Sequence, residues 1–146
     1  MASILEQETN STIQEWLGRV NSEGSLRAVE LDDKDRSGHL NQLFLDLAHR
    51  LRNPRPLGTI VEQSKAAHKH GLARREQGYS AAMLVEESRI LQVSIFDTLH
   101  KNEHRLDFKI LLLDVMVIAD EVDFQLVQTM TSFNGETKMD ARRKRD

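Results

Sequence analysis

The chain contains no cysteine, only two prolines and seven glycines, and few aromatic residues among its 146 positions. The lack of cysteine excludes a disulfide scaffold, a zinc site built from thiolates and a cysteine nucleophile. With 39% hydrophobic and 29% charged residues, the composition is neither disordered nor fibrous. The length suits one globular domain that buries a core without covalent staples.

Long apolar runs are also missing. No run is longer than that of Val115–Ala119, flanked by Asp114 and Asp120, whereas a transmembrane helix needs roughly 20 predominantly apolar residues. The N-terminus has neither a basic start nor an apolar stretch of signal-peptide length. A formal net charge of −3 argues against a dedicated nucleic-acid binder, which usually carries a basic excess. We therefore expect a cytoplasmic protein that binds neither membranes nor nucleic acid.

Helical periodicity fills the segments between the glycines and prolines. It predicts five helices, starting near residues 4, 32, 56, 81 and 105 and ending near 20, 52, 77, 99 and 133, with no strand. Pro54 stops the second helix, and Pro56 suits the first position of the third. Gly78 and Ser80 are expected to cap the third and fourth helices. The predicted fold is therefore all-α: a single compact bundle of about five helices with a long C-terminal helix.

Each of the first four predicted helices has one inner stripe of apolar or small residues. In chain order these stripes are Ile13, Trp16, Leu17 and Val20; Leu40, Leu43, Phe44, Leu47, Ala48 and Leu51; Leu57, Ile60, Val61, Ser64, Ala67 or His68, and Leu72; and Leu84, Ser88, Leu91, Ile95 and Leu99.

The last predicted helix is apolar on two neighbouring faces, which is typical of a central or dimer-forming helix. One face carries Ile110, Leu113, Val117, Phe124 and Val127, and the other Leu112, Met116, Ala119, Leu126 and Met130. We expect a homodimer that pairs through Leu112, Met116 and Leu126.

After residue 134 the chain has almost no apolar residues; Met139 and Ala141 are the exceptions. We expect residues 1–134 to form the domain, and residues 135–146 to be a polar basic tail or the start of a linker to an output domain. The cluster Arg142–Arg145 is a candidate for binding phosphate or acidic headgroups, although short charge runs are usually solvated.

Catalytic motifs are absent from the sequence. It has no glycine-rich phosphate loop, no Gly-x-Ser-x-Gly elbow and no His-Glu-x-x-His zinc helix. Acidic residues are numerous on the last predicted helix, but their spacing forms no tight acid–base pair and indicates a solvated face. They are Asp107, Asp114, Asp120, Glu121 and Asp123. We therefore expect no catalytic residue, no metal site and no enzymatic activity in this chain.

Histidines are the candidates for ligand binding. His68 and His70 lie on the third predicted helix, where either could contact haem or a small ligand, or lie hydrogen-bonded at a packing edge. Two positions apart, they point about 200° away from each other and cannot share a metal ion. His100 and His104 are four apart and could share a face, but no acidic motif stands near them in the sequence.

A second alternative is phosphotransfer through His49. The segment Leu47–Pro54 is similar to the phosphoacceptor box of histidine kinases, in which an acidic residue follows the histidine and serves as base. Here Arg50 follows His49, and a guanidinium cannot accept a proton. No glycine-rich ATP-lid motif follows downstream.

The segment His70–Leu91 joins two predicted helices through a Gly-Tyr-Ser turn. It resembles the RsbRD N-terminal domain family, named for RsbT co-antagonist proteins. Ser88 stands where the family often has tyrosine, and Gln92 where it often has arginine. The matching residues are His70, Gly71, Arg74, Gln77, Gly78, Tyr79, Ser80, Leu84, Glu87, Arg89 and Leu91.

This resemblance implies a non-catalytic sensory domain at the N-terminus of a bacterial sensor histidine kinase or stress-response regulator. It implies a compact helical bundle of globin-like form that pairs with itself and passes a signal through helix packing to a downstream domain. We predict no cofactor, with haem as the alternative given above. From the residues themselves, we expect Glu87 to reach back to Arg74 across the corner, joining the two helices by a charge-assisted hydrogen bond.

Overall fold

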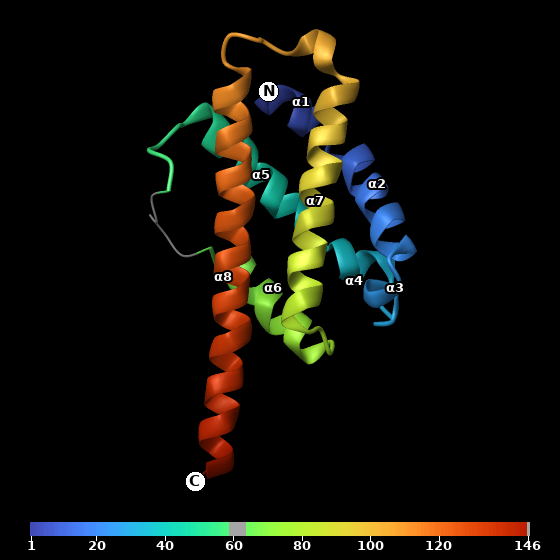
Figure 1. The fold of residues 1–146 in the computed structure, drawn as a ribbon, viewed down its shortest axis with the longest axis vertical. Coiled ribbons are helices and arrows are strands. Elements are labelled where there is room, and N and C mark those ends of the chain that lie inside the picture. Colours follow the sequence, from blue (N-terminus) through green and yellow to red (C-terminus); the bar gives the residue numbers. More distant parts are fainter. Residues whose placement is uncertain (59–63, 146) are drawn as a thin grey trace.

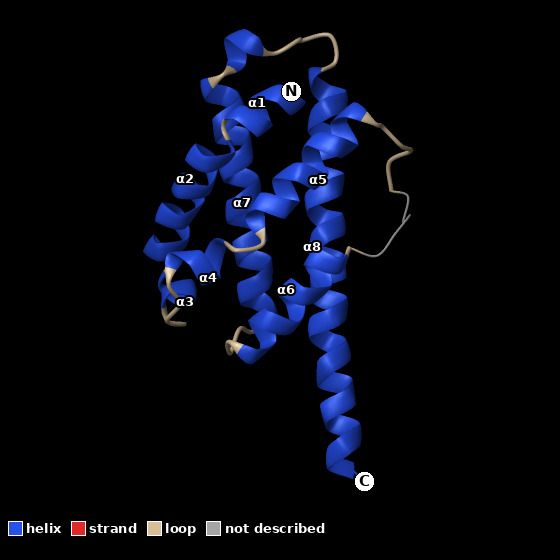
Figure 2. Ribbon diagram, turned by 180° about the vertical axis from the view of Figure 1, so that it is seen from behind, coloured by secondary structure: helices blue, strands red, loops and turns tan. Residues whose placement is uncertain are grey.

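The computed structural model describes residues 1–58 and 64–145, with side chains up to residue 135, and these residues form helices and loops without a strand (Figures 1 and 2). The helices are α1 (Ala2–Gln7), α2 (Thr9–Ser22), α3 (Gly24–Arg27), α4 (Asp33–Ser37), α5 (Leu40–Arg52), α6 (Lys65–Glu76), α7 (Ala81–Lys101) and α8 (Leu111–Arg145), with a 3-10 turn at Glu103–Arg105. The predicted all-α bundle is confirmed.

The two longest helices, α7 and α8, run antiparallel and form the frame of the molecule (Figure 1). Helices α5 and α6 pack on α8, and α2 packs on α7, as the view from behind shows (Figure 2). The N-terminal helix α1 lies against α5. The last part of α8 extends past the rest of the bundle (Figure 1).

The core sits between these layers and follows the predicted stripes of α2, α5 and α7. On α2 every predicted stripe residue is buried, and Trp16 is almost completely so. On α5 only Leu51 of the predicted stripe is partly exposed, and on α7 only Ser88 is. The amphipathic periodicity of these three helices therefore predicted their inner faces correctly.

Two predicted helices are each divided in the structure. The first is interrupted at Glu8, where the hydroxyls of Thr9 and Thr12 donate to the carbonyls of Leu5 and Glu8 at 2.7 Å. Such side chain to backbone hydrogen bonds bend helices. The second is divided into α4 and α5 at residues 38–39. Sequence periodicity does not register such short breaks.

The third predicted helix begins nine residues later than expected, at Lys65, so the prediction of helix from Pro56 is wrong for residues 56–58. Gly58 has a φ of +75°, which a right-handed helix cannot contain. Ser64 is the N-cap of α6, with its hydroxyl accepting from the Ala67 amide at 3.1 Å. Ile60 and Val61 of the predicted stripe lie outside the described residues.

The prediction for the last helix is wrong about its ends and its buried faces. Helix α8 begins at Leu111 instead of near Arg105, and its backbone continues past Phe133 to Arg145, so the expected polar tail is helical up to that residue. Of the ten residues on the two predicted stripes, only Val117 is buried. The buried face is instead half polar, because Glu121 and Gln125 meet charged groups on α5 and Ser132 meets α6. Its buried residues are Val117, Ile118, Glu121, Val122, Gln125, Thr129, Ser132 and Phe133.

Within the part of the chain that the structure describes, no helix combines the length and the apolarity needed to cross a bilayer.

Candidate functional site

A close helix crossing positions the candidate site. At Gly71, helix α6 touches α8 so closely that an added Cβ would lie 2.0 Å from Ser132 Oγ and 2.3 Å from the Thr129 carbonyl oxygen. The Ser132 hydroxyl also donates to the carbonyl of His68 at 2.9 Å. Because only glycine permits this approach, residue 71 sets the distance between α6 and α8. The crossing brings the preceding residue, His70, into the interior.

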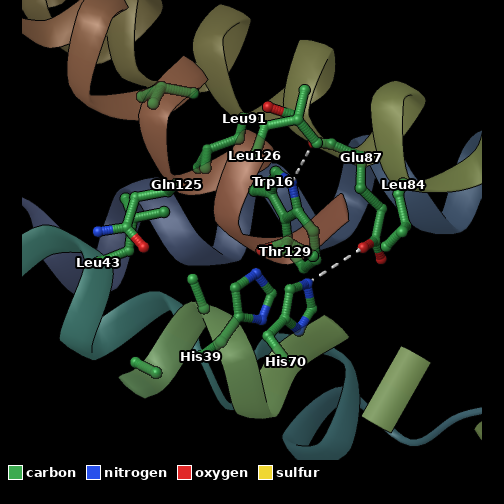
Figure 3. A pocket seen from close by; sticks show the side chains of 14 residues that line it. Trp16, His39, Leu43, His70, Leu84, Glu87, Leu91, Gln125, Leu126 and Thr129 are labelled. Atoms are coloured by element: carbon green, nitrogen blue, oxygen red, sulfur yellow. Dashed lines mark hydrogen bonds and ion pairs between the residues drawn. The ribbon is translucent and has the colours of Figure 1, made fainter. Parts of the chain in front are cut away.

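Two histidines stack on each other at this place (Figure 3). His39 lies between α4 and α5, and its ring centroid is 3.6 Å from that of His70 with an interplanar angle of 17°. The edge of Trp16, from α2, contacts His39 with ring centroids 6.1 Å apart. Sequence reasoning missed His39, because its short polar stretch carries no periodicity that predicts burial.

A cavity of about 50 Å³ lies beside the stacked rings. Its walls come from α2, α5, α6, α7 and α8 and are mostly apolar, with a few hydrogen-bonding side chains among them (Figure 3). The lining residues are Trp16, His39, Leu43, Ala66, Ala67, His70, Leu84, Glu87, Ser88, Leu91, Val122, Gln125, Leu126 and Thr129. Residues from α2, from the middle of the chain and from the long last helix thus line one cavity.

A buried charged network closes one side of the cavity. Glu87 Oε1 accepts from Arg74 Nε at 3.1 Å, and Glu87 Oε2 accepts from the Tyr79 hydroxyl at 2.7 Å. Arg36 Nη1 donates to the Tyr79 oxygen at 2.7 Å, and Arg74 Nη1 donates to Gln77 Oε1 at 2.7 Å. The Arg74–Glu87 contact predicted from the sequence is present. Arg36 is the member of this network that the sequence did not indicate.

Burial keeps both imidazoles uncharged near neutral pH. It lowers the pKa of His39 well below its usual value, and the charges of His70 and Arg74 act in the same direction. Burial, followed by the charge of Arg74, lowers the pKa of His70 to about 3. Burial also raises the pKa of the Glu87 carboxyl, while Arg74 opposes that shift. The site therefore presents neutral rings beside a carboxyl group that already has two donors.

The stacked pair does not suit a metal or haem. The nitrogen lone pairs of parallel rings lie in the ring planes and do not converge, and no group of three metal-ligating side chains occurs among the described residues. Ligand cavities of drug-sized molecules measure about 300–1,000 Å³, whereas this one measures about 50 Å³. The expected alternative of haem bound through His70 does not fit this geometry.

The other histidines lie away from the site. His68 is exposed, on the opposite side of α6 from His70, as their spacing predicts. His49 is exposed on α5, and its Nδ1 is 3.4 Å from Asn53 Nδ2. His100 and His104 are exposed, and His100 Nδ1 is 3.6 Å from Glu103. No described carboxylate pairs with His49, so the geometry gives no support to the phosphotransfer alternative.

Most of the motif residues that carry the family resemblance gather at this corner. His70, Leu84, Glu87 and Leu91 line the cavity, and Gly71 forms the crossing. Gly78 has the left-handed φ of +87° that its turn requires, and the Ser80 hydroxyl accepts from the Met83 amide at 3.2 Å. Arg89 is different, because it pairs with Glu86 on the surface.

A second buried network fixes α8 to α5. It corrects the prediction of a solvated acidic face at Asp120 and Glu121, whereas Asp107 and Asp123 are exposed as predicted. Arg50 Nη1 donates to Glu121 Oε2 at 2.9 Å, and Arg50 also pairs with Asp120. Asp120 Oδ2 accepts from the backbone amide of Gly58 at 3.1 Å, and the hydrogen bond from Arg50 lowers the pKa of Asp120. Gln125 Nε2 is 3.3 Å from Glu121 Oε1.

The residues predicted to form a dimer interface are not equivalent in the structure. Leu112 and Met116 are 73% and 46% exposed on α8. Leu126 is half-buried and lines the cavity. Of the three residues predicted to form the dimer interface, two are therefore exposed on the surface of α8 and one lines the cavity.

Comparison of the chain with protein-family models, with curated proteins and with solved structures gave no match. The RsbRD resemblance and the globin-like arrangement therefore stay predictions from the sequence.

Proposed function

We propose that this chain is a non-catalytic sensory domain of a bacterial signal-transduction protein. A change at the cavity alters the packing of α8, and α8 carries the change to a downstream domain. One observation carries this proposal: α8 lines the cavity with four residues and also extends past the bundle (Figure 1). Those residues are Val122, Gln125, Leu126 and Thr129. The resemblance of His70–Leu91 to the RsbRD family supports the same function.

The contacts of α8 support such a role because they link the cavity to the rest of the helix. Arg50 holds α8 at Glu121, and Gly71 meets it at Ser132, on either side of the cavity-lining residues. A helix of 35 residues is about 50 Å long. A small tilt at the cavity therefore becomes a larger displacement at the far end, provided that two packing states exist and the signal favours one.

The second part of the proposal is that the domain acts as a homodimer through α8. Leu112, Met116 and Val127 are exposed, and their spacing places them on one face of the helix. Asp123 lies on the same side of α8 and accepts at Oδ1 from Gln92 Nε2 of α7 at 3.1 Å. This face of α8 is therefore next to α7. Exposed apolar side chains that share a face are typical of interaction surfaces. A second copy of the chain would cover them.

A fusion protein tests the sensory function. The chain is joined through α8 to the dimerisation and catalytic region of a histidine kinase that lacks its own sensor. One to four residues are inserted at the junction, because each insertion rotates the output domain by about 100°. We expect autophosphorylation to rise and fall across the series, and Leu126→Ala at the cavity to shift its level. Constant activity across the insertions and in Leu126→Ala would overturn the proposal.

The dimer is tested separately by native mass spectrometry of the intact chain. We expect Leu112→Glu and Met116→Glu to convert a dimer into monomers, whereas Leu45→Glu, at an exposed apolar residue of α5, should leave the dimer unchanged. A dimer that persists in the two α8 variants would refute the pairing.

A further inference from the structure

The stacked imidazoles have hydrogen-bonding capacity that the described protein atoms do not use. His39 Nδ1 is buried and has no hydrogen-bond partner among the described residues. His70 Nε2 is 3.8 Å from Glu87 Oε1, which is too far for a hydrogen bond. Buried polar atoms in folded proteins almost always have partners. Both rings line the cavity, so a molecule in it can meet them.

The charges around the cavity define what kind of molecule it suits. No lysine or arginine lines it among the described residues, so an anion would lack a counter-charge. Among the described lining residues Glu87 alone is charged, and its two oxygens already accept from Arg74 and Tyr79. The neutral rings add no charge of their own. An uncharged molecule is therefore favoured over either kind of ion.

The volume of the cavity and the polarity of its walls further restrict which molecules it can bind. A cavity of about 50 Å³ is roughly a third of the 150 Å³ cavity that holds benzene, which leaves room for only a few non-hydrogen atoms. Leu43, Leu84 and Leu91 offer apolar contact. Gln125 and Thr129, both buried on α8, add polar groups to the cavity wall.

We propose that this cavity binds a small uncharged molecule with an apolar body and one hydrogen-bonding end, such as a short-chain alcohol or amide, and that His39 and His70 bind its polar end. Contacts with Gln125 and Thr129 would join the bound molecule to α8. The inference deepens the proposed function, on which its role as a signal rests, although binding itself does not depend on signalling. A ligand of so few atoms binds with a Kd on the order of millimolar.

Trp16 makes this binding measurable without a label. It is the sole tryptophan of the chain, it is buried, and it lies at the cavity in edge contact with His39. The intact chain is titrated with propan-1-ol and acetamide, and separately with formate and ethylammonium as charged molecules of similar size. We expect a saturable change in tryptophan fluorescence with the two uncharged probes and none with the ions. A linear response, or saturation by the ions alone, would overturn the proposal.

A matched pair of variants distinguishes the cavity from other binding places. Ala66→Leu adds bulk at the half-buried second position of α6, which lines the cavity, and Ala82→Leu adds the same bulk at the exposed second position of α7. We expect saturation to disappear in Ala66→Leu and to persist in Ala82→Leu. Equal affinity in both variants would place the binding elsewhere.

A third variant tests the role of the imidazole nitrogens. His39→Phe keeps an aromatic ring for stacking and removes the hydrogen-bonding atoms, so acetamide should bind about tenfold more weakly. Unchanged affinity in folded His39→Phe would remove His39 from the site. The circular dichroism spectrum and thermal transition of each variant show that it is folded.

The failure of the site and the failure of the sensory function give different results. If acetamide binds but does not change autophosphorylation in the fusion protein described above, the site stands and its role as a signal is wrong. If acetamide does not bind while the insertion series still changes autophosphorylation, the sensory function stands and this site is wrong.

Discussion

Arg50 of α5 and Glu121 of α8 form an ion pair in which both side chains are buried, with Nη1 2.9 Å from Oε2. The two residues are 71 positions apart in the chain. Helix α8 thus presents charge to the interior and apolar side chains such as Leu112 to its surface.

Removing Arg50 is expected to leave the buried Glu121 carboxylate with only its longer and more exposed contact, Arg55 Nη2 at 3.4 Å from Oε2. Arg50→Ala should lower the free energy of unfolding by about 3 kcal/mol, because breaking one side of a buried pair costs more than the pair contributes. Urea denaturation followed by circular dichroism measures this loss in the free energy of unfolding. The matched control is Arg52→Ala, whose side chain pairs with Glu6 on the surface, and which should leave the midpoint nearly unchanged. Equal losses in the two variants would contradict the prediction.

The corner between α6 and α7 is expected to depend on the ionised form of Glu87. Glu87→Gln keeps the size of the side chain but weakens its hydrogen bonds with Arg74 and Tyr79, so the free energy of unfolding should fall by about 2 kcal/mol. The melting temperature should fall by several degrees, as measured by calorimetry. Glu86→Gln, at the neighbouring surface position, is the control and should leave it unchanged. An unaltered transition in Glu87→Gln would show that the corner is held by packing alone.

Two glycines in helices should respond to alanine in opposite directions. Gly71→Ala would place a Cβ 2.0 Å from Ser132 Oγ and force α6 away from α8, at an expected cost of about 2 kcal/mol in stability. At Gly18, in the middle of α2, an added Cβ meets no atom within 4 Å, so Gly18→Ala should stabilise by about 0.5–1 kcal/mol. The urea concentrations at the unfolding midpoints of the two variants, compared with that of the native chain, test both expectations. A stabilised Gly71→Ala would mean that the crossing is looser than the structure shows.

The stability of the domain is expected to fall in mild acid because of the stacked pair. The pKa of His70 is about 3 in the folded chain, against an ordinary value of 6.5. Below pH 6.5 the unfolded chain therefore binds a proton that the folded chain does not, and the free energy of unfolding decreases as the pH falls. The lowered pKa of His39 acts in the same direction, whereas the raised pKa of Glu87 opposes it at lower pH. The positive charge of Arg74 contributes to the lowered pKa of both histidines.

The measurement is urea denaturation between about pH 7 and about pH 5. The His70→Gln variant should lose less stability than the native chain over this interval. His68→Gln, on the exposed side of the same helix, should keep the native pH dependence. If the two variants follow the same curve, His70 does not contribute to the acid sensitivity.

The parts of the fold that sequence reasoning predicted correctly depend on local signals. The stripes of α2, α5 and α7 have helical spacing, and the turn between α6 and α7 carries Gly78 and Ser80 at the positions that their conformations require. The Arg74–Glu87 contact was also predictable, because the two residues lie on helices joined by that turn. These features can be predicted from short segments without knowing how the rest of the chain folds.

The parts that were missed depend on pairing between distant residues. Glu121 looked like one of several solvated acids because nothing near it in the sequence shows that Arg50 meets it. The apolar residues of α8 suggested the wrong inner face, since periodicity assumes that apolar side chains are buried. His39 was overlooked for a similar reason, as its stack with His70 exists only once α6 has crossed α8.

The charged inner face of α8 restricts how this helix can move. Purely apolar faces tolerate a shift of one turn, because one leucine can take the place of another. If α8 slid along its axis by one turn, Arg50 would face Val117 or Gln125 instead of Glu121, and its buried charge would lose its partner. Piston motion of α8 along its axis is therefore penalised, and a displacement that keeps the Arg50–Glu121 pair intact costs less free energy.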